Sequence, residues 1–155
     1  MKLTQEEYLS QVITAFMSLY ASRPIVNEAI EKRFEHHPSG KVIVLSKSCF
    51  WKEALFTYEK ENDMEGHFIF VIYKDSSSGS YRCQAVPKVA GTFENRGGLK
   101  EEWRGKTEEE VAQLSGLPDA VFCHHSGFIG GAKSLESTLK MADMSLPKDE
   151  ETLVI

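Results

Sequence analysis

Two runs of strand-forming residues separated by a short turn constrain the fold of this chain most strongly. Residues 67–73 are rich in β-branched and aromatic side chains, and residues 81–86 alternate between two faces. Between them, residues 75–79 read Asp-Ser-Ser-Ser-Gly, which is a turn sequence. The pattern predicts an antiparallel hairpin whose second strand places Arg82 and Gln84 on one face.

Helices and further strands surround this hairpin in the predicted order. Helices are predicted over residues 4–22, 24–34, 51–59, 107–114 and 134–142, and strands over residues 41–45 and 120–123. Thr4 and Thr107 begin capping boxes, and Pro24 suits the first position of the second helix. These elements predict an α+β fold with a mixed sheet of about four or five strands and packed helices. We predict one domain over residues 1–146, followed by an acidic tail over residues 147–155.

The composition limits the setting in which the chain works. Of its 155 residues 41% are hydrophobic, which is enough for one core, and no apolar run approaches the roughly 20 residues that cross a bilayer. The first residues are polar and acidic, unlike a signal peptide, so we expect an intracellular location without distinguishing nucleus, mitochondrion and cytoplasm. The three cysteines are widely spaced and predict reduced, buried thiols.

The charge of the chain argues against a general nucleic-acid binder. The net charge is −5, and residues 106–155 carry 4 basic against 9 acidic side chains. Proteins that bind nucleic acid without sequence preference display a broad basic field. Any phosphate that this chain binds must therefore be held locally by a few placed groups.

A glycine-containing segment over residues 124–133 is the most informative candidate site. It follows the predicted strand at 120–123 and precedes the last helix, where paired glycines let backbone N–H groups approach an anion. Ser126 can donate a hydroxyl, Lys133 adds a charge, and His124 can donate to a phosphate oxygen or transfer a proton. The alternative is a glycine-rich turn with a satisfied histidine. The spacing matches neither a Walker loop nor a Rossmann fingerprint.

Three arginines form a second group of candidates. Arg82 lies on the polar face of the predicted strand, and Arg96 and Arg104 lie in a long glycine-containing loop over residues 88–105. Guanidinium groups suit bidentate contacts with phosphate. The alternative is that each arginine pairs with an acidic residue of the same chain.

Two tryptophans stand beside cations at Trp51-Lys52 and Trp103-Arg104. Each indole can stack on a nucleobase or make a cation–π contact. The alternative, packing in the core, is the more common use of tryptophan.

The residues needed for catalysis within this chain are scarce. His36-His37 and His124-His125 are adjacent pairs, which point to opposite faces on a strand, and Asp-x-Asp is absent. We therefore predict no metal ligands in this chain. A small-molecule hydrolase that uses Cys123 and His124 is a weaker alternative, because no orienting partner is evident.

Five motifs in a fixed order resemble the carboxyl-terminal half of the Myg-one family. They are Trp-Lys-Glu-Ala-Leu at 51–55, Arg-Cys-Gln-Ala-Val-Pro at 82–87, Phe-Glu-Asn-Arg at 93–96, Trp-Arg-Gly at 103–105 and His-His-Ser-Gly-Phe-Ile-Gly-Gly at 124–131. The resemblance runs from about residue 9 to residue 146. Longer members resemble the Asp-His-His (DHH) phosphoesterases and are described as exonucleases that act on RNA.

The resemblance implies a substrate-binding cap that works with a separate metal site. In such proteins Mn or Mg belongs to an amino-terminal domain, which has no counterpart here, so no cofactor is expected in this chain. The positions that match the family pattern are Arg82, Asn95, Arg96, Arg104, His124, Ser126, Gly127, Phe128, Gly130, Gly131 and Lys133. His125 stands where alanine is expected and Ala132 where a polar residue is expected, which puts the detail of the ligand contacts in doubt.

The leading hypothesis is the substrate-positioning half of a metal-dependent phosphodiesterase that acts on nucleic acid or nucleotides. The expected phosphate ligands are Lys52, Arg82, Asn95, Arg96, Arg104, Ser126, Gly127, Gly130, Gly131 and Lys133, with His124 assisting catalysis. Alone, such a chain is expected to show negligible turnover. The alternative is a binding module that acts in trans with a separate catalytic subunit, or that self-associates.

Overall fold

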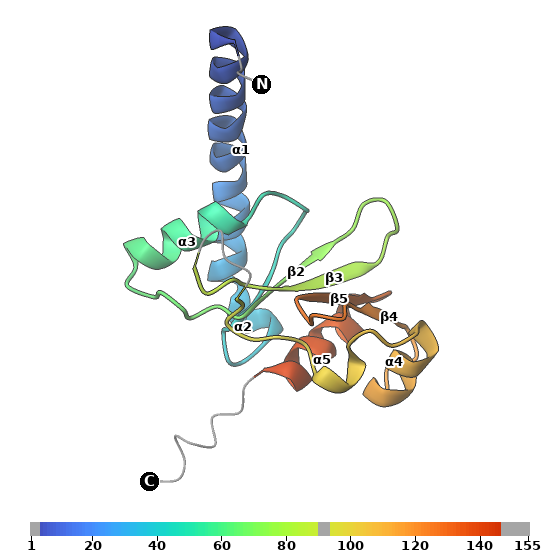
Figure 1. Cartoon of the computed structure of the whole chain (residues 1–155). Helices are drawn as coiled ribbons and strands as arrows, with labels where there is room; N and C mark the ends of the chain where they lie inside the picture. The colour runs from blue at the N-terminus through green and yellow to red at the C-terminus, as the bar shows by residue number, and fades with distance from the viewer. Residues whose placement is uncertain (1–3, 90–93, 147–155) are drawn as a thin grey trace.

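A computed structural model of the chain describes residues 4–89 and 94–146 and has a five-stranded sheet at its centre (Figure 1). The strands are β1 (Val42–Val44), β2 (Phe70–Lys74), β3 (Tyr81–Ala85), β4 (Ala120–Cys123) and β5 (Ile129–Ala132). They lie in the order β1-β2-β3-β5-β4, with β1 parallel to β2 and every other pair antiparallel. The predicted α+β fold with a mixed sheet is confirmed, including the β2–β3 hairpin.

The helices divide between the two faces of the sheet. They are α1 (Gln5–Glu31), α2 (Arg33–His36), α3 (Lys52–Glu61), α4 (Glu108–Ser115) and α5 (Leu135–Ser145), with a 3-10 turn over Glu101–Trp103. Helices α4 and α5 contact β2 to β5, whereas α1 and α2 contact β1. The buried residues form two clusters, one on each face.

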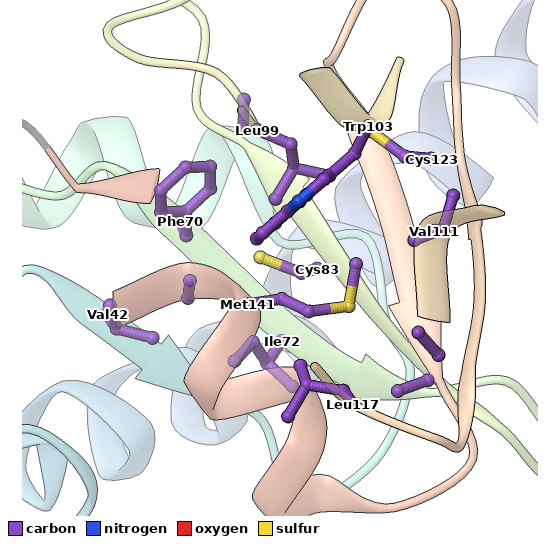
Figure 2. Packing of buried hydrophobic residues seen from close by; sticks show 14 of the residues in the cluster. Val42, Phe70, Ile72, Cys83, Leu99, Trp103, Val111, Leu117, Cys123 and Met141 are labelled. Carbon is purple, nitrogen blue, oxygen red and sulfur yellow. The ribbon is translucent and has the colours of Figure 1, made fainter. Parts of the chain in front are cut away.

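The first core lies between the sheet and the α4–α5 layer. Figure 2 shows Trp103, Leu99, Phe70 and Met141 gathered around Cys83, and all five side chains are fully buried. The second core lies between the other face and α1 and α3, and it includes Trp51, which is 5% exposed. Both tryptophans therefore pack in cores, and neither indole is free to stack on a base.

The predicted helix caps explain where α4 and α5 begin and end. Thr107 accepts the Glu110 N–H, and Glu110 accepts the Thr107 N–H, which confirms the capping box. Gly116 ends α4 in the left-handed region at a φ of +74°. Ser134 caps α5 by accepting the Ser137 N–H, so these local signals set both helices.

Helix α1 corrects one prediction, because the two helices expected at 4–22 and 24–34 are joined. Pro24 lies inside α1. A proline removes one intrahelical hydrogen bond, but it does not stop a helix whose following turns are held by packing. Val26 and Ile30 are fully buried in the second core and hold those turns against α3 and β1.

The predicted loop over residues 88–105 is ordered where the structure describes it. Asn95 forms an isolated bridge with Pro87, and the 3-10 turn buries Trp103. Residues 90–93 and the predicted tail at 147–155 lie outside the described residues.

Candidate functional site

A tight hairpin joins β4 to β5 where one long loop was predicted over residues 124–133. The His124 N–H donates to the Ile129 carbonyl at 2.9 Å, and the Gly127 N–H donates to the His124 carbonyl at 2.9 Å. Gly127 has a φ of +76°, which a side chain would disfavour. The loop is therefore confined to residues 124–128, which we call the β4–β5 turn, and residues 129–132 of the predicted loop form strand β5.

Gly130 and Gly131 lie inside β5, between β3 and β4, and not at the start of a helix. The backbone N–H groups of a strand that has a neighbour on each side form hydrogen bonds with those neighbouring strands. Helix α5 begins only at Leu135, after its cap Ser134. The predicted geometry, in which these glycines offer free amides to an anion at a helix N-terminus, is therefore wrong.

The two glycines allow neighbouring groups to approach β5 closely. A Cβ on Gly130 would lie 2.5 Å from the Leu99 Cδ1 and 2.9 Å from the Phe122 carbonyl oxygen. A Cβ on Gly131 would overlap the Tyr81 carbonyl oxygen. Neither position has room for a side chain unless a neighbour moves. The two glycines therefore allow β5 to pack closely against the residues around it.

One face of β3, β5 and β4 has no helix over it among the described elements. Figure 1 shows α1 and α3 at the β1 end of the sheet and α4 and α5 below the other strands, which leaves the opposite face of those strands open. The register aligns Tyr73 with Arg82, Arg82 with Gly131, and Gly131 with Phe122. The next aligned pairs are Val71 with Gln84 and Gln84 with Ile129.

We call this surface the open face, formed by Tyr73, Arg82, Gln84, Phe122 and Ile129, all of which are half-buried. Its Arg82–Gln84 side was predicted from the alternation of residues 81–86. Phe122 was missed, because only the register of the β4–β5 hairpin places it opposite Gly131.

Arg82 lies across the open face with its guanidinium carbon 4.7 Å from the centre of the Phe122 ring. Gly131 between them has no side chain, which lets the two groups meet. The Arg82 Nη1 donates to the Ser80 hydroxyl at 2.7 Å, and Nη2 lies 3.4 Å from the Asp75 carboxylate. Arg82 is therefore fixed on the surface, with part of its donor capacity used within the chain.

Arg96 is turned into the molecule. Its Nη1 and Nη2 donate to the two Glu59 carboxylate oxygens at 2.5 and 2.6 Å, and Nη1 also donates to the Phe68 carbonyl at 3.0 Å. The Arg96 and Glu59 side chains are 7% and 1% exposed. The guanidinium lies 5.2 Å from the Phe56 ring centre. The sequence predicted that Arg96 binds phosphate, whereas in the structure its guanidinium pairs with the buried carboxylate of Glu59.

Arg104 differs from both, because its Nη1 and Nη2 have no hydrogen-bond partner among the described residues. Its Nε donates to the Leu99 carbonyl at 2.9 Å, which fixes the direction of the side chain. The guanidinium lies against Gly98 and Gly127, where a Cβ would collide with it. The result is an oriented, half-buried arginine beside the β4–β5 turn with its outer donors available.

His124 completes this group from within the turn. Its Nδ1 accepts the Ser126 N–H at 3.2 Å, so the neutral ring carries its proton on Nε2. The Ser126 hydroxyl also lies 2.9 Å from Nδ1. The His125 and Phe128 rings lie 4.1 and 4.7 Å from the His124 ring, centre to centre. The two histidines are thus side by side in a turn and do not oppose each other as strand residues would.

The remaining predicted residues lie apart from this group. Lys52 is exposed at the start of α3, and Lys133 is exposed after β5. Asn95 is half-buried beside Pro87. Ala132, one of the two departures from the family pattern, is fully buried in the first core and does not face a ligand. The structure therefore brings together Arg104, His124, Ser126 and Gly127, with Arg82 on the open face.

The geometry does not favour Cys123 as a nucleophile. Its side chain is buried, and burial raises the pKa of the thiol to about 11 even though Arg104 lowers it. The His124 Nδ1 is directed to Ser126, not to the sulfur. A protonated thiol without a base is a poor nucleophile.

The described part of the chain contains neither a cluster of metal ligands nor a membrane-spanning helix. Within residues 4–89 and 94–146, no three His, Cys, Asp or Glu side chains gather as a metal site would need. None of the described helices has the length and apolar character needed to span a membrane.

Comparison with known proteins assigns the family. Residues 1–146 match the model of the MYG1 exonuclease family, described as "Uncharacterised protein family (UPF0160)". The chain belongs to this family. It is 42% identical to the MYG1 exonuclease of Bos taurus over 147 residues, which are 94% of this chain and 38% of the relative. The human MYG1 exonuclease is 41% identical over 94% of this chain and 39% of its own length.

The MYG1 protein of Dictyostelium discoideum is 39% identical over 99% of this chain and 46% of the relative. The chain thus spans less than half the length of these MYG1 relatives and corresponds to a carboxyl-terminal portion. No solved structure matches it, so the predicted likeness to the cap of DHH phosphoesterases stays a prediction.

Proposed function

We propose that this chain is the substrate-positioning part of a MYG1-type exonuclease and that it holds a nucleic-acid strand at the β4–β5 turn. The observation that carries the proposal is the oriented Arg104, whose guanidinium lies against Gly127 of the turn in which His124 and Ser126 are hydrogen-bonded to each other. The family name supplies the substrate class, since relatives are named exonucleases. The cutting chemistry belongs to groups outside the described residues.

Each group in the turn has a distinct task in this proposal. Arg104 binds one phosphate with Nη1 and Nη2, because the bond from its Nε to the Leu99 carbonyl fixes the guanidinium and leaves those two nitrogens without a partner among the described residues. The His124 Nε2–H donates a second hydrogen bond, and the Ser126 N–H and hydroxyl at Nδ1 hold the imidazole ring in place. Together they supply the local positive site that a chain of net charge −5 needs for a polyanion.

The open face continues this site along the sheet. Arg82 stacked on Phe122, together with the Tyr73 hydroxyl that donates to the Gln84 amide oxygen at 3.0 Å, makes a flat polar and aromatic surface. A strand whose phosphate rests on Arg104 can lie across this surface. Arg96 stabilises the fold in this proposal, because its donors are taken by Glu59 and the Phe68 carbonyl.

The test is the affinity of the chain for a short single-stranded RNA carrying a fluorophore, measured by anisotropy at fixed salt. We expect Arg104→Ala to weaken binding about tenfold or more, because a charge-assisted hydrogen bond contributes roughly 1.5–3 kcal/mol. Arg104→Lys should recover part of the lost affinity, because lysine keeps the positive charge but cannot make the bidentate contact of a guanidinium group.

The matched control is Lys140→Ala, which removes an exposed cation of α5 that pairs with Glu136. Its affinity should equal that of the wild type. Equal losses in Arg104→Ala and Lys140→Ala would indicate non-specific electrostatics, and unchanged binding in Arg104→Ala would refute the proposal. Arg96→Ala is unsuitable as a binding test, because it breaks a buried ion pair.

A further inference from the structure

The amino-terminal half of α1 carries large apolar side chains that the described chain leaves uncovered. Figure 1 shows this half projecting from the body, whereas the other half packs against α3 and β1. Six of its side chains are 47–71% exposed: Tyr8, Leu9, Val12, Ile13, Met17 and Tyr20. Single exposed apolar residues are common on proteins, but a continuous apolar patch marks an interaction surface.

These six residues lie on one side of the helix. At about 100° per residue they occupy half of its circumference, while Glu7, Ser10, Gln11 and Thr14 occupy the other half. A projecting helix of a few turns is only marginally stable in water on its own. The six residues, which we call the α1 apolar face, therefore favour a partner of matching shape and apolar character.

We propose that this partner is a second copy of the chain, with the two α1 helices packed antiparallel about a two-fold axis that crosses the apolar face at the level of residue 14. The order of side chains along the face is self-complementary, because a tyrosine stands at each end and aliphatic residues stand between them. The axis places Tyr8 of one copy beside Tyr20 of the other and pairs the aliphatic middle parts. Such an isologous contact uses the same surface on both copies, so the assembly is complete as a dimer.

The charges of α1 favour the antiparallel arrangement over the parallel one. Glu6 and Glu7 lie in the first turn of α1, and Arg23 lies beyond the far end of the apolar face. Antiparallel packing keeps Glu6 and Glu7 of the two copies apart, places them near Arg23, which already donates to Glu61 of its own chain, and opposes the two helix dipoles. Parallel packing gathers four carboxylates at one end, which is unfavourable.

The size of the surface also fits a dimer. Six large side chains that are about half exposed present on the order of 600 Å² per copy, close to the roughly 800 Å² per partner of a standard interface. Neighbouring parts of both copies would add to this area. A combined area of about 1,200 Å² lies at the lower limit of the range for specific, stable interfaces.

Sedimentation velocity across a range of micromolar concentrations tests the proposal. The wild type should sediment as a dimer, and the Ile13→Glu/Met17→Glu variant as a monomer with an unchanged circular dichroism spectrum. The matched control is Gln11→Glu/Thr14→Glu, which adds the same charge to the polar half and should leave the dimer intact. A monomeric wild type would overturn the proposal, as would a dimer that survives Ile13→Glu/Met17→Glu.

Disulfide trapping tests the direction of packing in a Cys49→Ser background. Antiparallel helices should cross-link a mixture of Tyr8→Cys and Tyr20→Cys chains to each other, whereas parallel helices would cross-link each variant to itself. Cross-linking within each variant would contradict the antiparallel pair. If the α1 apolar face instead binds the additional region that longer relatives carry, the chain alone will be monomeric, and that result also counts against a second copy.

Discussion

Glu59→Gln is expected to lower the free energy of unfolding by roughly 3–5 kcal/mol, because it leaves the buried Arg96 guanidinium without a counter-charge. Glu59 is 1% exposed and accepts both terminal nitrogens of Arg96. The Arg96 Nε has no hydrogen-bond partner among the described residues, so the guanidinium depends on this carboxylate. Urea denaturation followed by tryptophan fluorescence measures the change.

The matched control is the exposed ion pair between Arg23 and Glu61. Its side chains are 45% and 52% exposed, so Glu61→Gln should cost about 0–1 kcal/mol. The double variant Glu59→Leu/Arg96→Met should recover much of the loss, because two apolar groups can replace a buried pair. Equal costs for Glu59→Gln and Glu61→Gln would contradict the assignment of Arg96 to a buried structural pair.

Gly131→Ala is expected to destabilise the chain by about 3 kcal/mol or more, because the added Cβ overlaps the Tyr81 carbonyl and forces β3 away from β5. Gly131 lies in the middle of the sheet, between β3 and β4, so the damage should spread to both ladders. The same urea titration measures it.

Gly79→Ala is the control for this second prediction. Gly79 has open space around its missing Cβ, and only its φ of +76° disfavours a side chain, so the cost should be roughly 1–2 kcal/mol. A Gly131→Ala chain that is as stable as the wild type but no longer binds RNA would show that Gly131 acts on the ligand. That outcome would restore the anion-binding role predicted from the sequence.

Local signals in the sequence predicted much of the fold. The capping boxes at Thr4 and Thr107 and the cap at Ser134 fix helix starts through bonds between residues three apart, which a sequence displays directly. The β2–β3 hairpin follows from alternation and its turn. Pro24 misled the prediction of α1, because the packing of Val26 and Ile30 is a tertiary effect.

The candidate site was predicted in its residue types more than in its geometry. A Gly-Gly pair can precede a helix or lie within a closely packed strand. Only the pairing of β5 with both β3 and β4 shows that Gly130 and Gly131 lie within a strand. Arg96 and Glu59 are distant in sequence and meet through the packing of α3. The Arg104 guanidinium fits against Gly98 and Gly127 because neither has a side chain, and the spacing of these residues in the sequence does not reveal this contact.

Nuclear magnetic resonance titration of the ¹⁵N-labelled chain with a short single-stranded RNA tests the central claim most directly. Chemical shift changes should concentrate on residues 124–128, the Arg104 Nε–H and Gly98, and then extend to Arg82 and Phe122 on the open face. The amides of α4 and α5 should stay unchanged. Changes confined to α3, α4 or α5, or no change at the β4–β5 turn at saturating RNA, would contradict the claim that this turn holds the substrate.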